Sequence, residues 1–334
     1  MPLPHFSDRQ VAGQRLMVGF EGTEITSELR YFIKELHVGG LILFAINLES
    51  PEQIQNLVRS AQEYAASCGQ PPLLIAIDQE GGPVARLKEP FTRFPGNPAM
   101  KSTDDAIQFA RITASELKSI GVNMNMAPVM DVPQKDIQSV MIDRAFGFDP
   151  EWVASMGNTV IQTLQENGIM AVAKHFPGIG RTVLDSHIDA PFLDTALSEM
   201  EPTDLLPFRA AIACDVAGIM LSHIRYTQLD PDLPASLSRR IVQELLRDRM
   251  GFQGLVLTDD LDMGAICNFF DIRESVRNLF DAGVDVALVC HEGPDIPSAF
   301  EEMLACTARS TAHKELANHS LTRILQTKKM YGLF

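Results

Sequence analysis

Short apolar runs alternate with longer amphipathic stretches along the chain, and this alternation constrains the fold more than any other feature. Within each run the apolar residues are largely continuous, as is typical of parallel strands that are buried on both faces. Eight such runs occur, at residues 17–20, 40–44, 73–78, 122–132, 170–176, 217–224, 254–260 and 284–290.

The stretches between the runs carry the start and stop signals of helices. Residues 50–67 open with Ser-Pro, a favoured pair for the N-cap and the first turn. Residues 102–121 place Ser and Thr ahead of acidic residues and end on Gly, so both ends of this helix are marked. Stretches of the same form lie at residues 149–168, 236–251 and 272–283.

Repeated strand–helix units predict a parallel sheet with right-handed crossovers, and eight units close into a (β/α)8 barrel of the TIM type. Such barrels run from about 200 to more than 400 residues as one unit. No linker is visible, so we predict a single barrel domain over residues 1–334. A doubly wound open sheet is the competing architecture, but its nucleotide-binding form would carry a GxGxxG motif after the first strand, which this chain lacks.

Charge and cysteine content exclude several classes of partner. The net charge of −15 would repel phosphate backbones and anionic membranes, so neither nucleic acid nor a membrane is an expected partner. The five cysteines are scattered without metal-binding spacing, and we expect no metal and no cofactor. The chain shows neither a signal-peptide pattern nor an apolar run of about 18 residues, which predicts a cytoplasmic protein.

Ionisable residues collect where the apolar runs end. Because loops that follow the strands build the active face of such a barrel, these side chains are expected to converge on one site, although some could form structural ion pairs. They are Asp78 and Glu80, Asp131, Lys174 and His175, His223, and Asp259 and Asp260.

Several segments around these residues resemble the bacterial β-N-acetylglucosaminidases of glycoside hydrolase family 3. They include AIDQEGGPVARL at 76–87, DRAFGFDP at 143–150, KHFPG at 174–178 with a downstream DSH at 185–187, and GFQGLVLTDDLDMGAI at 251–266. The resemblance runs from about residue 10 to about residue 290. It implies exo-hydrolysis of terminal, non-reducing β-linked N-acetylglucosamine with retention of configuration.

The resemblance makes Asp259, the first Asp of the TDDLDM segment, the nucleophile that forms a covalent glycosyl-enzyme. Asp260 is the rival. Because side chains alternate along a strand, we expect only one of the two to point into the barrel mouth. The default role for Asp260 is a hydrogen bond in a cap or loop.

The resemblance also implies an unusual acid/base, a dyad of His187 and Asp185 drawn from the DSH motif. A histidine titrates near neutrality, so one side chain can protonate the leaving oxygen and later deprotonate water. A neighbouring carboxylate can orient the ring and stabilise its protonated form.

The resemblance implies that substrate is bound by side chains that can hydrogen-bond to sugar hydroxyls or to an acetamido carbonyl. They are Asp78, Arg86, Arg144, Lys174 and His175. Arg86 lies eight residues beyond Asp78 and could return to the same pocket across the GGPVA turn. Asp131 is either a further binding residue or an ion-pair partner, and Glu80 is expected to brace the adjacent turn. His223 and Met263 either line the pocket or are structural.

The chain departs from the family pattern at three places. Relatives usually read KHFPGHG, DQEGGRV and Arg-Asn where this chain has Ile179, Pro83 and Ile46-Asn47. None of these positions is the predicted nucleophile, a dyad residue or a predicted sugar-binding residue.

The resemblance implies that the substrate is a cytoplasmic cell-wall fragment, N-acetylglucosamine on 1,6-anhydro-N-acetylmuramic acid, with or without peptide. Two alternatives stay open: a glycoside phosphorylase, because a cationic His tolerates incoming phosphate better than a carboxylate would, and a non-catalytic sugar-binding protein on the same barrel.

Overall fold

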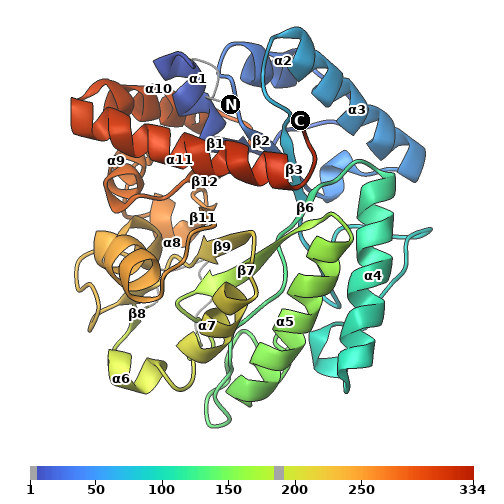
Figure 1. The fold of residues 1–334 in the computed structure, drawn as a ribbon, viewed down its shortest axis with the longest axis vertical. Coiled ribbons are helices and arrows are strands. Elements are labelled where there is room, and N and C mark those ends of the chain that lie inside the picture. Colours follow the sequence, from blue (N-terminus) through green and yellow to red (C-terminus); the bar gives the residue numbers. More distant parts are fainter. Residues whose placement is uncertain (1–5, 184–191) are drawn as a thin grey trace.

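The fold is a closed barrel of eight parallel strands (Figure 1), seen in a computed structural model that describes residues 6–183 and 192–334. The strands run round the barrel in chain order, and β1 pairs with both β2 and β12 to close it. They are β1 (Leu16–Val18), β2 (Gly40–Leu43), β3 (Leu74–Ile77), β6 (Met124–Asn125), β7 (Met170–Phe176), β9 (Gly218–Leu221), β11 (Leu255–Asp260) and β12 (Val286–Val289). Every predicted apolar run overlaps one of these strands, so the predicted barrel is confirmed and the open sheet is excluded.

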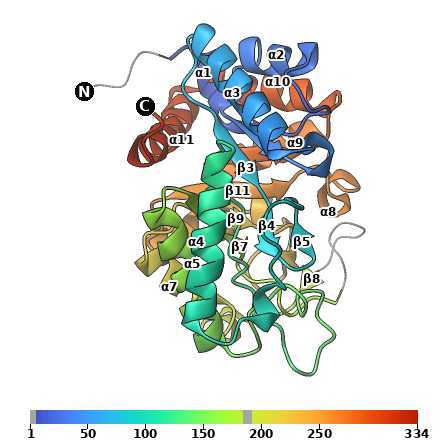
Figure 2. The ribbon, with the colours of Figure 1, turned by 90° about the vertical axis from the view of Figure 1, so that its right-hand side faces the viewer.

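Helices follow the strands and cover the outside of the barrel (Figures 1 and 2). The predicted caps are present: Ser50 accepts the backbone N–H of Gln53, and Ser102 accepts that of Asp105. The helices are α1 (Asp8–Gln14), α2 (Ser27–Lys34), α3 (Pro51–Ser67), α4 (Thr103–Ser119), α5 (Pro150–Glu166), α6 (Leu197–Met200), α7 (Leu205–Ala213), α8 (Gly264–Cys267), α9 (Ile272–Ala282), α10 (Asp295–Ala308) and α11 (Thr311–Met330).

One predicted helix, over residues 236–251, is divided in the structure. A short 3-10 turn, η3 (Ala235–Leu237), precedes a π-helix, η4 (Arg240–Arg249). The hydroxyl of Ser238 accepts the backbone N–H of Ile241 at 3.2 Å, so Ser238 rather than Ser236 caps the helix. Ser236 is thereby left in the turn, where its hydroxyl lies 2.8 Å from Nδ1 of His223.

Two pairs of short strands lie in the loops that follow barrel strands. β4 (Gln79–Gly81) and β5 (Val84–Ala85) form a hairpin, and β8 (Phe192–Leu193) pairs with β10 (Arg225–Tyr226). Figure 2 shows β4, β5 and α8 on the side of the molecule away from α11. This side is the mouth formed by the C-terminal ends of the barrel strands.

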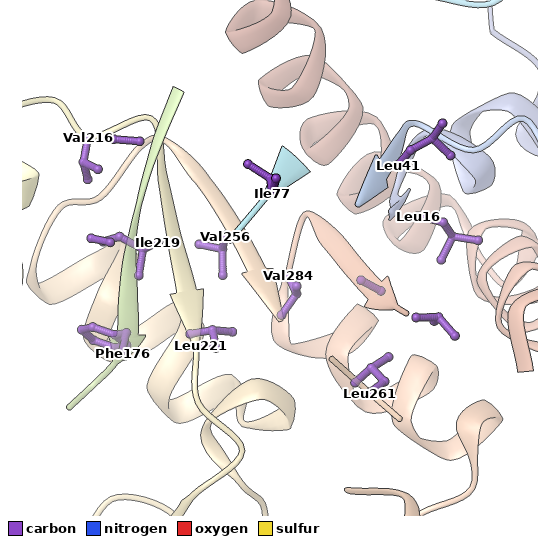
Figure 3. Close-up of a cluster of buried hydrophobic side chains, with 14 of the residues drawn as sticks. Leu16, Leu41, Ile77, Phe176, Val216, Ile219, Leu221, Val256, Leu261 and Val284 are labelled. Atoms are coloured by element: carbon purple, nitrogen blue, oxygen red, sulfur yellow. The ribbon is translucent and has the colours of Figure 1, made fainter. Parts of the chain in front are cut away.

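The apolar core has two layers because side chains alternate along each strand. Leu16 and Leu41 belong to the outer layer, between strands and helices, where Figure 3 shows Ile77, Ile219 and Val256 with them. Met17, which follows Leu16, belongs to the second layer inside the barrel. Other members of this inner layer are Ile42, Leu74, Met124, Met170, Val172, Leu257 and Leu288, together with Ile324 from α11.

Helix α11 closes the end of the barrel opposite the mouth and places a lysine in a fully buried position there. The Lys328 ammonium donates to the side-chain oxygen of Gln14 at 2.9 Å and to the carbonyl oxygen of Gly39 at 3.0 Å. Neither partner is an anion, and burial lowers the pKa of Lys328 to about 7.

We expect the folded state to become more stable as the pH rises from about 7 to about 10, because a solvated lysine in the unfolded chain titrates near 10.4. Between these values the unfolded chain binds a proton that folded Lys328 does not. Urea unfolding at several pH values, run on the wild type and on Lys328→Met, measures this contribution as the difference between the two curves. An identical pH dependence in both proteins would show that Lys328 is not neutral in the folded state.

Among the described residues, no helix is both long enough and apolar enough to cross a bilayer.

Candidate active site

A cavity of about 600 Å³ opens at the barrel mouth and is lined by residues from seven barrel strands or the loops after them. It brings together six of the eight predicted site residues: Asp78, Arg86, Arg144, Lys174, His175 and Asp259. The other two, Asp185 and His187, lie outside the residues that the structure describes.

Lys174, at the end of β7, is the buried centre of the charged network that lines the cavity. Its ammonium lies 2.7 Å from Oδ1 of Asp78 and 2.7 Å from Oε1 of Glu80. Burial on its own would raise the pKa of Asp78, but the charges of Lys174 and Arg86 outweigh burial and lower it to about 2. Asp78 is therefore ionised at neutral pH, and its carboxylate can accept hydrogen bonds from sugar hydroxyls.

Arg86 reaches the same carboxylate from the hairpin that follows β3. Its Nη2 lies 3.3 Å from Oδ2 of Asp78, as the predicted turn across GGPVA requires. The tip of the hairpin contains Gly81 at φ +86° and Gly82 at φ +60°, values that other residues rarely adopt. Pro83 follows as an exposed residue, so the missing arginine of the family pattern leaves this turn intact.

Glu80 has a larger role than the predicted turn brace. Besides Lys174, it binds Arg144 through two parallel bonds, from Nε at 3.0 Å and from Nη2 at 2.8 Å. Burial would raise the pKa of Glu80, but Lys174 and Arg144 outweigh this effect and lower it. Glu80 thus fixes two of the predicted sugar-binding cations against each other.

His175 is held by Asp131 on one side and Arg144 on the other. Its Nδ1 lies 2.8 Å from Oδ2 of Asp131, and its Nε2 lies 3.5 Å from Nη2 of Arg144. Burial, followed by the positive charge of Arg144, lowers the pKa of His175 to about 3, so the ring is neutral. Because Arg144 can only donate, Nε2 is the accepting nitrogen and Nδ1–H donates to Asp131. Asp131 is therefore the partner of a predicted binding residue.

The departure at Ile179 preserves this arrangement, because the contact uses the backbone. The N–H of Ile179 donates to Oδ1 of Asp131 at 2.7 Å, whatever the side chain. Asn47 is likewise structural: its amide donates at 2.9 Å to the carbonyl oxygens of Phe20 and Gly22, while Ile46 is exposed.

Asp259 and Asp260 end strand β11, and both contact the cavity. The expectation that only one of them reaches the mouth is wrong, because the pairing of β11 with β12 shifts register between Leu257 and Asp260. The two residues nevertheless differ in the hydrogen bonds that their side chains make. Oδ1 of Asp260 accepts the backbone N–H groups of Asp262 and Cys290, each at 3.1 Å, which is the predicted loop role.

The charge of Asp259 acts on the network described above. It raises the pKa of both Arg144 and His175, although burial and other charges dominate each group. A carboxylate at a rigid strand end therefore lies beside the side chains suited to holding a sugar.

One further cluster at the mouth could hold a cation. Asp260, Asp262 and His291 each offer a ligand atom, and these atoms lie within 4.8 Å of one another. Backbone hydrogen bonds already occupy this cluster, including the one from His291 N–H to Oδ2 of Asp262 at 2.8 Å. This cluster was not predicted from the sequence: Asp262 lies within the TDDLDM segment but was given no role there, and His291 lies just beyond the end of the resemblance. His223 and Met263 both line the cavity, which was one of the two predicted alternatives, the other being a structural role.

An eight-stranded barrel with a network of carboxylates and cations at its mouth fits the expected glycoside hydrolase. The model of the glycosyl hydrolase family 3 N-terminal domain matches residues 9–327. A β-hexosaminidase of Nitrosomonas eutropha is 37% identical over 298 residues, which cover 86% of this chain and 83% of the relative. One of Pseudomonas aeruginosa is 36% identical over 83% of this chain and 82% of its own length.

Solved structures agree with these relatives. A family 3 β-N-acetylglucosaminidase from Paenibacillus sp. superposes with a TM-score of 0.95 at 37% identity, over 98% of this chain; the chain spans 63% of that protein. A β-N-acetylhexosaminidase from Beutenbergia cavernae gives a TM-score of 0.90 at 29% identity, over 97% of this chain and 99% of its own. The chain belongs to glycosyl hydrolase family 3. The predicted family and the predicted enzyme class, a β-hexosaminidase, are confirmed.

Proposed function

We propose that this protein releases terminal, non-reducing β-linked N-acetylglucosamine with retention of configuration. The observation that carries the proposal is the position of Asp259, at the end of β11, in one cavity with Asp78, Lys174, Arg144 and His175. The Paenibacillus relative, which is named a β-N-acetylglucosaminidase, supports the choice of sugar.

In the proposed mechanism, an oxygen of Asp259 attacks the anomeric carbon while His187 donates a proton to the departing glycosidic oxygen. The carbon–oxygen bond of the glycoside breaks, and an ester between the sugar and Asp259 forms. His187 then removes a proton from water, whose oxygen displaces Asp259 and restores the β configuration. Asp185 would orient His187 and stabilise its protonated form.

The network around Lys174 would hold the sugar during both steps. The ionised Asp78 can accept from two hydroxyls, while the cations Arg86, Lys174 and Arg144 can donate to hydroxyl or acetamido oxygens. Neutral His175 would stay outside the proton transfers, because its pKa of about 3 lies far below neutral pH.

We further propose that the natural substrate is the 1,6-anhydro-N-acetylmuramic acid glycoside of this sugar, with or without peptide, and that the enzyme acts on it in the cytoplasm as a single domain over residues 1–334. Incubation with purified anhydromuropeptides, followed by mass spectrometry of the products, tests the substrate. Cell fractionation tests the location.

Chromogenic 4-nitrophenyl glycosides test the sugar specificity. We expect kcat/KM for the β-N-acetylglucosaminide to exceed that for the β-glucoside and the β-xyloside by about 100-fold or more, because a site that hydrogen-bonds an acetamido group rejects sugars without one. Equal rates on the glucoside would overturn the assignment of N-acetylglucosamine. The same assay in phosphate buffer separates the alternatives: sugar 1-phosphate as the main product indicates a phosphorylase, and no turnover at all indicates a sugar-binding protein.

A further inference from the structure

We propose that His223 is a positioning residue that holds the backbone beside Asp259 in the geometry for attack. This inference rests on the proposed function of Asp259. It concerns the end of strand β11, where the ladder with β9 stops before Asp259, while the pairing with β12 continues to Asp260.

The ladder between β9 and β11 ends at the pair Leu221 and Thr258. Asp259 and Asp260 come next, so β9 supplies no ladder bond to the backbone that carries the carboxylate. The next link between the two segments is a side chain. Nε2 of His223, two residues beyond Leu221, lies 2.8 Å from the backbone carbonyl oxygen of Asp260.

The partners of His223 define which of its nitrogens carries the proton. A carbonyl oxygen can only accept, so Nε2 is protonated and donates to Asp260. Nδ1 lies 2.8 Å from the hydroxyl of Ser236, and in a neutral ring it accepts the proton of that hydroxyl. The Asp260 carbonyl therefore selects this tautomer of His223, and the Ser236 hydroxyl donates to its other ring nitrogen.

Ser236 is itself rigidly placed. It is fully buried in the turn η3, and two backbone hydrogen bonds join this turn to the segment that carries His223. The N–H of Ser236 donates to the carbonyl oxygen of Ser222 at 3.0 Å, and that of Ala235 donates to Ile224 at 2.9 Å. Ser236, His223 and the Asp260 carbonyl thus form one continuous chain of hydrogen bonds.

The other side of Asp260 is fixed to strand β12. Its Oδ1 accepts the N–H of Cys290 at 3.1 Å, and the N–H of the next residue, Leu261, donates to the carbonyl oxygen of Leu288 at 3.0 Å. The N–H of Asp260 donates to Oδ1 of Asp259 at 2.9 Å. Holding Asp260 from both sides therefore restricts the Asp259 carboxylate, and His223 supplies the contact from the β9 side.

Two substitutions at His223 separate its hydrogen bond from its shape. Phe keeps the planar ring without the donor, whereas Gln places an amide N–H near the position of Nε2. We expect His223→Phe to lower kcat about 100-fold, as a displacement of about 1 Å at a reacting group does, with KM changed less than about threefold. His223→Gln should recover most of the loss.

The leaving group distinguishes this role from acid/base catalysis. A 2,4-dinitrophenyl glycoside needs little protonation, so a defect in proton donation disappears with it, whereas a misplaced nucleophile stays slow. We expect the loss in His223→Phe to persist on that substrate and the pH profile to keep its shape. The rate of covalent labelling by a 5-fluoro-N-acetylglucosaminyl fluoride should fall in parallel with kcat.

Ser236→Ala is the second variant, and it decides the matter if His223→Phe does not fold. Loss of the hydroxyl removes the hydrogen bond that orients the His223 ring, and we expect kcat to fall about tenfold at nearly constant KM. Unchanged kcat in Ser236→Ala and His223→Phe would overturn the proposal, as would a Gln variant no better than Phe. Failure of the proposed function itself looks different, because Asp259→Ala would then be as active as the wild type.

Discussion

Replacing Asp259 by alanine should lower kcat/KM for a chromogenic β-N-acetylglucosaminide on the order of 10⁴-fold or more, because loss of a nucleophile removes the covalent route entirely. The protein should remain folded, since the described contact of its carboxylate is one hydrogen bond from the adjacent Asp260 N–H. Steady-state kinetics with the thermal midpoint measured in parallel checks both expectations. An Asp259→Ala enzyme within tenfold of the wild type would refute the assignment.

Asp262→Asn is the matched control for this loss. Asp262 contacts the same cavity, and its Oδ2 accepts the backbone N–H of His291, which an asparagine oxygen can also do. We expect its kcat to stay within about threefold of the wild type. Added azide sharpens the comparison: in Asp259→Ala it should replace the missing nucleophile and give the α-glycosyl azide, whereas loss of an acid/base residue would give the β-azide.

Replacing Lys174 by methionine should lower the free energy of unfolding by about 3–5 kcal/mol, because it leaves buried carboxylates without their shared cation. Lys174 is almost fully buried and contacts both Asp78 and Glu80 at 2.7 Å. At acidic pH the carboxylates of Asp78 and Glu80 can be protonated, which removes part of this destabilisation. The variant should therefore lose less stability at acidic pH than at neutral pH. Urea unfolding of wild type and variant at both pH values gives the two differences.

Lys314→Met is the matched control, because Lys314 forms an ion pair at nearly the same distance but is not buried. Lys314 lies 2.8 Å from Asp8, but about half of its side chain is exposed. Exposed ion pairs contribute less than about 1 kcal/mol, so this variant should unfold almost like the wild type. Equal losses from Lys174→Met and Lys314→Met would show that the network at the mouth does not stabilise the fold.

The barrel could be predicted because each strand is a continuous apolar run and buried parallel strands require one. Helices with a strong cap, such as the one after Ser50, could also be placed to within a residue. The start of the π-helix η4 could not be predicted in this way, because it depends on whether Ser236 or Ser238 supplies the cap. That choice is made by tertiary contacts, including the bond of 2.6 Å from Ser238 to Asp230.

The cavity residues could be predicted because the family motifs fall at strand ends, and strand ends meet at the mouth. Which of these residues contact each other could not be predicted, because it depends on distances across the barrel. Glu80 read as a turn residue in the sequence, yet it joins Lys174 and Arg144, which lie far from it along the chain. His223 is similar: only its position between Ser236 and Asp260 reveals its role.

The central claim is that catalysis proceeds through a sugar ester on Asp259. Labelling the wild-type enzyme with a 5-fluoro-N-acetylglucosaminyl fluoride, digesting it and sequencing the modified peptide by tandem mass spectrometry tests this claim most directly. We expect one sugar per chain, attached to Asp259. A sugar on Asp260 or another carboxylate, or turnover of the reagent without any covalent adduct, would contradict it.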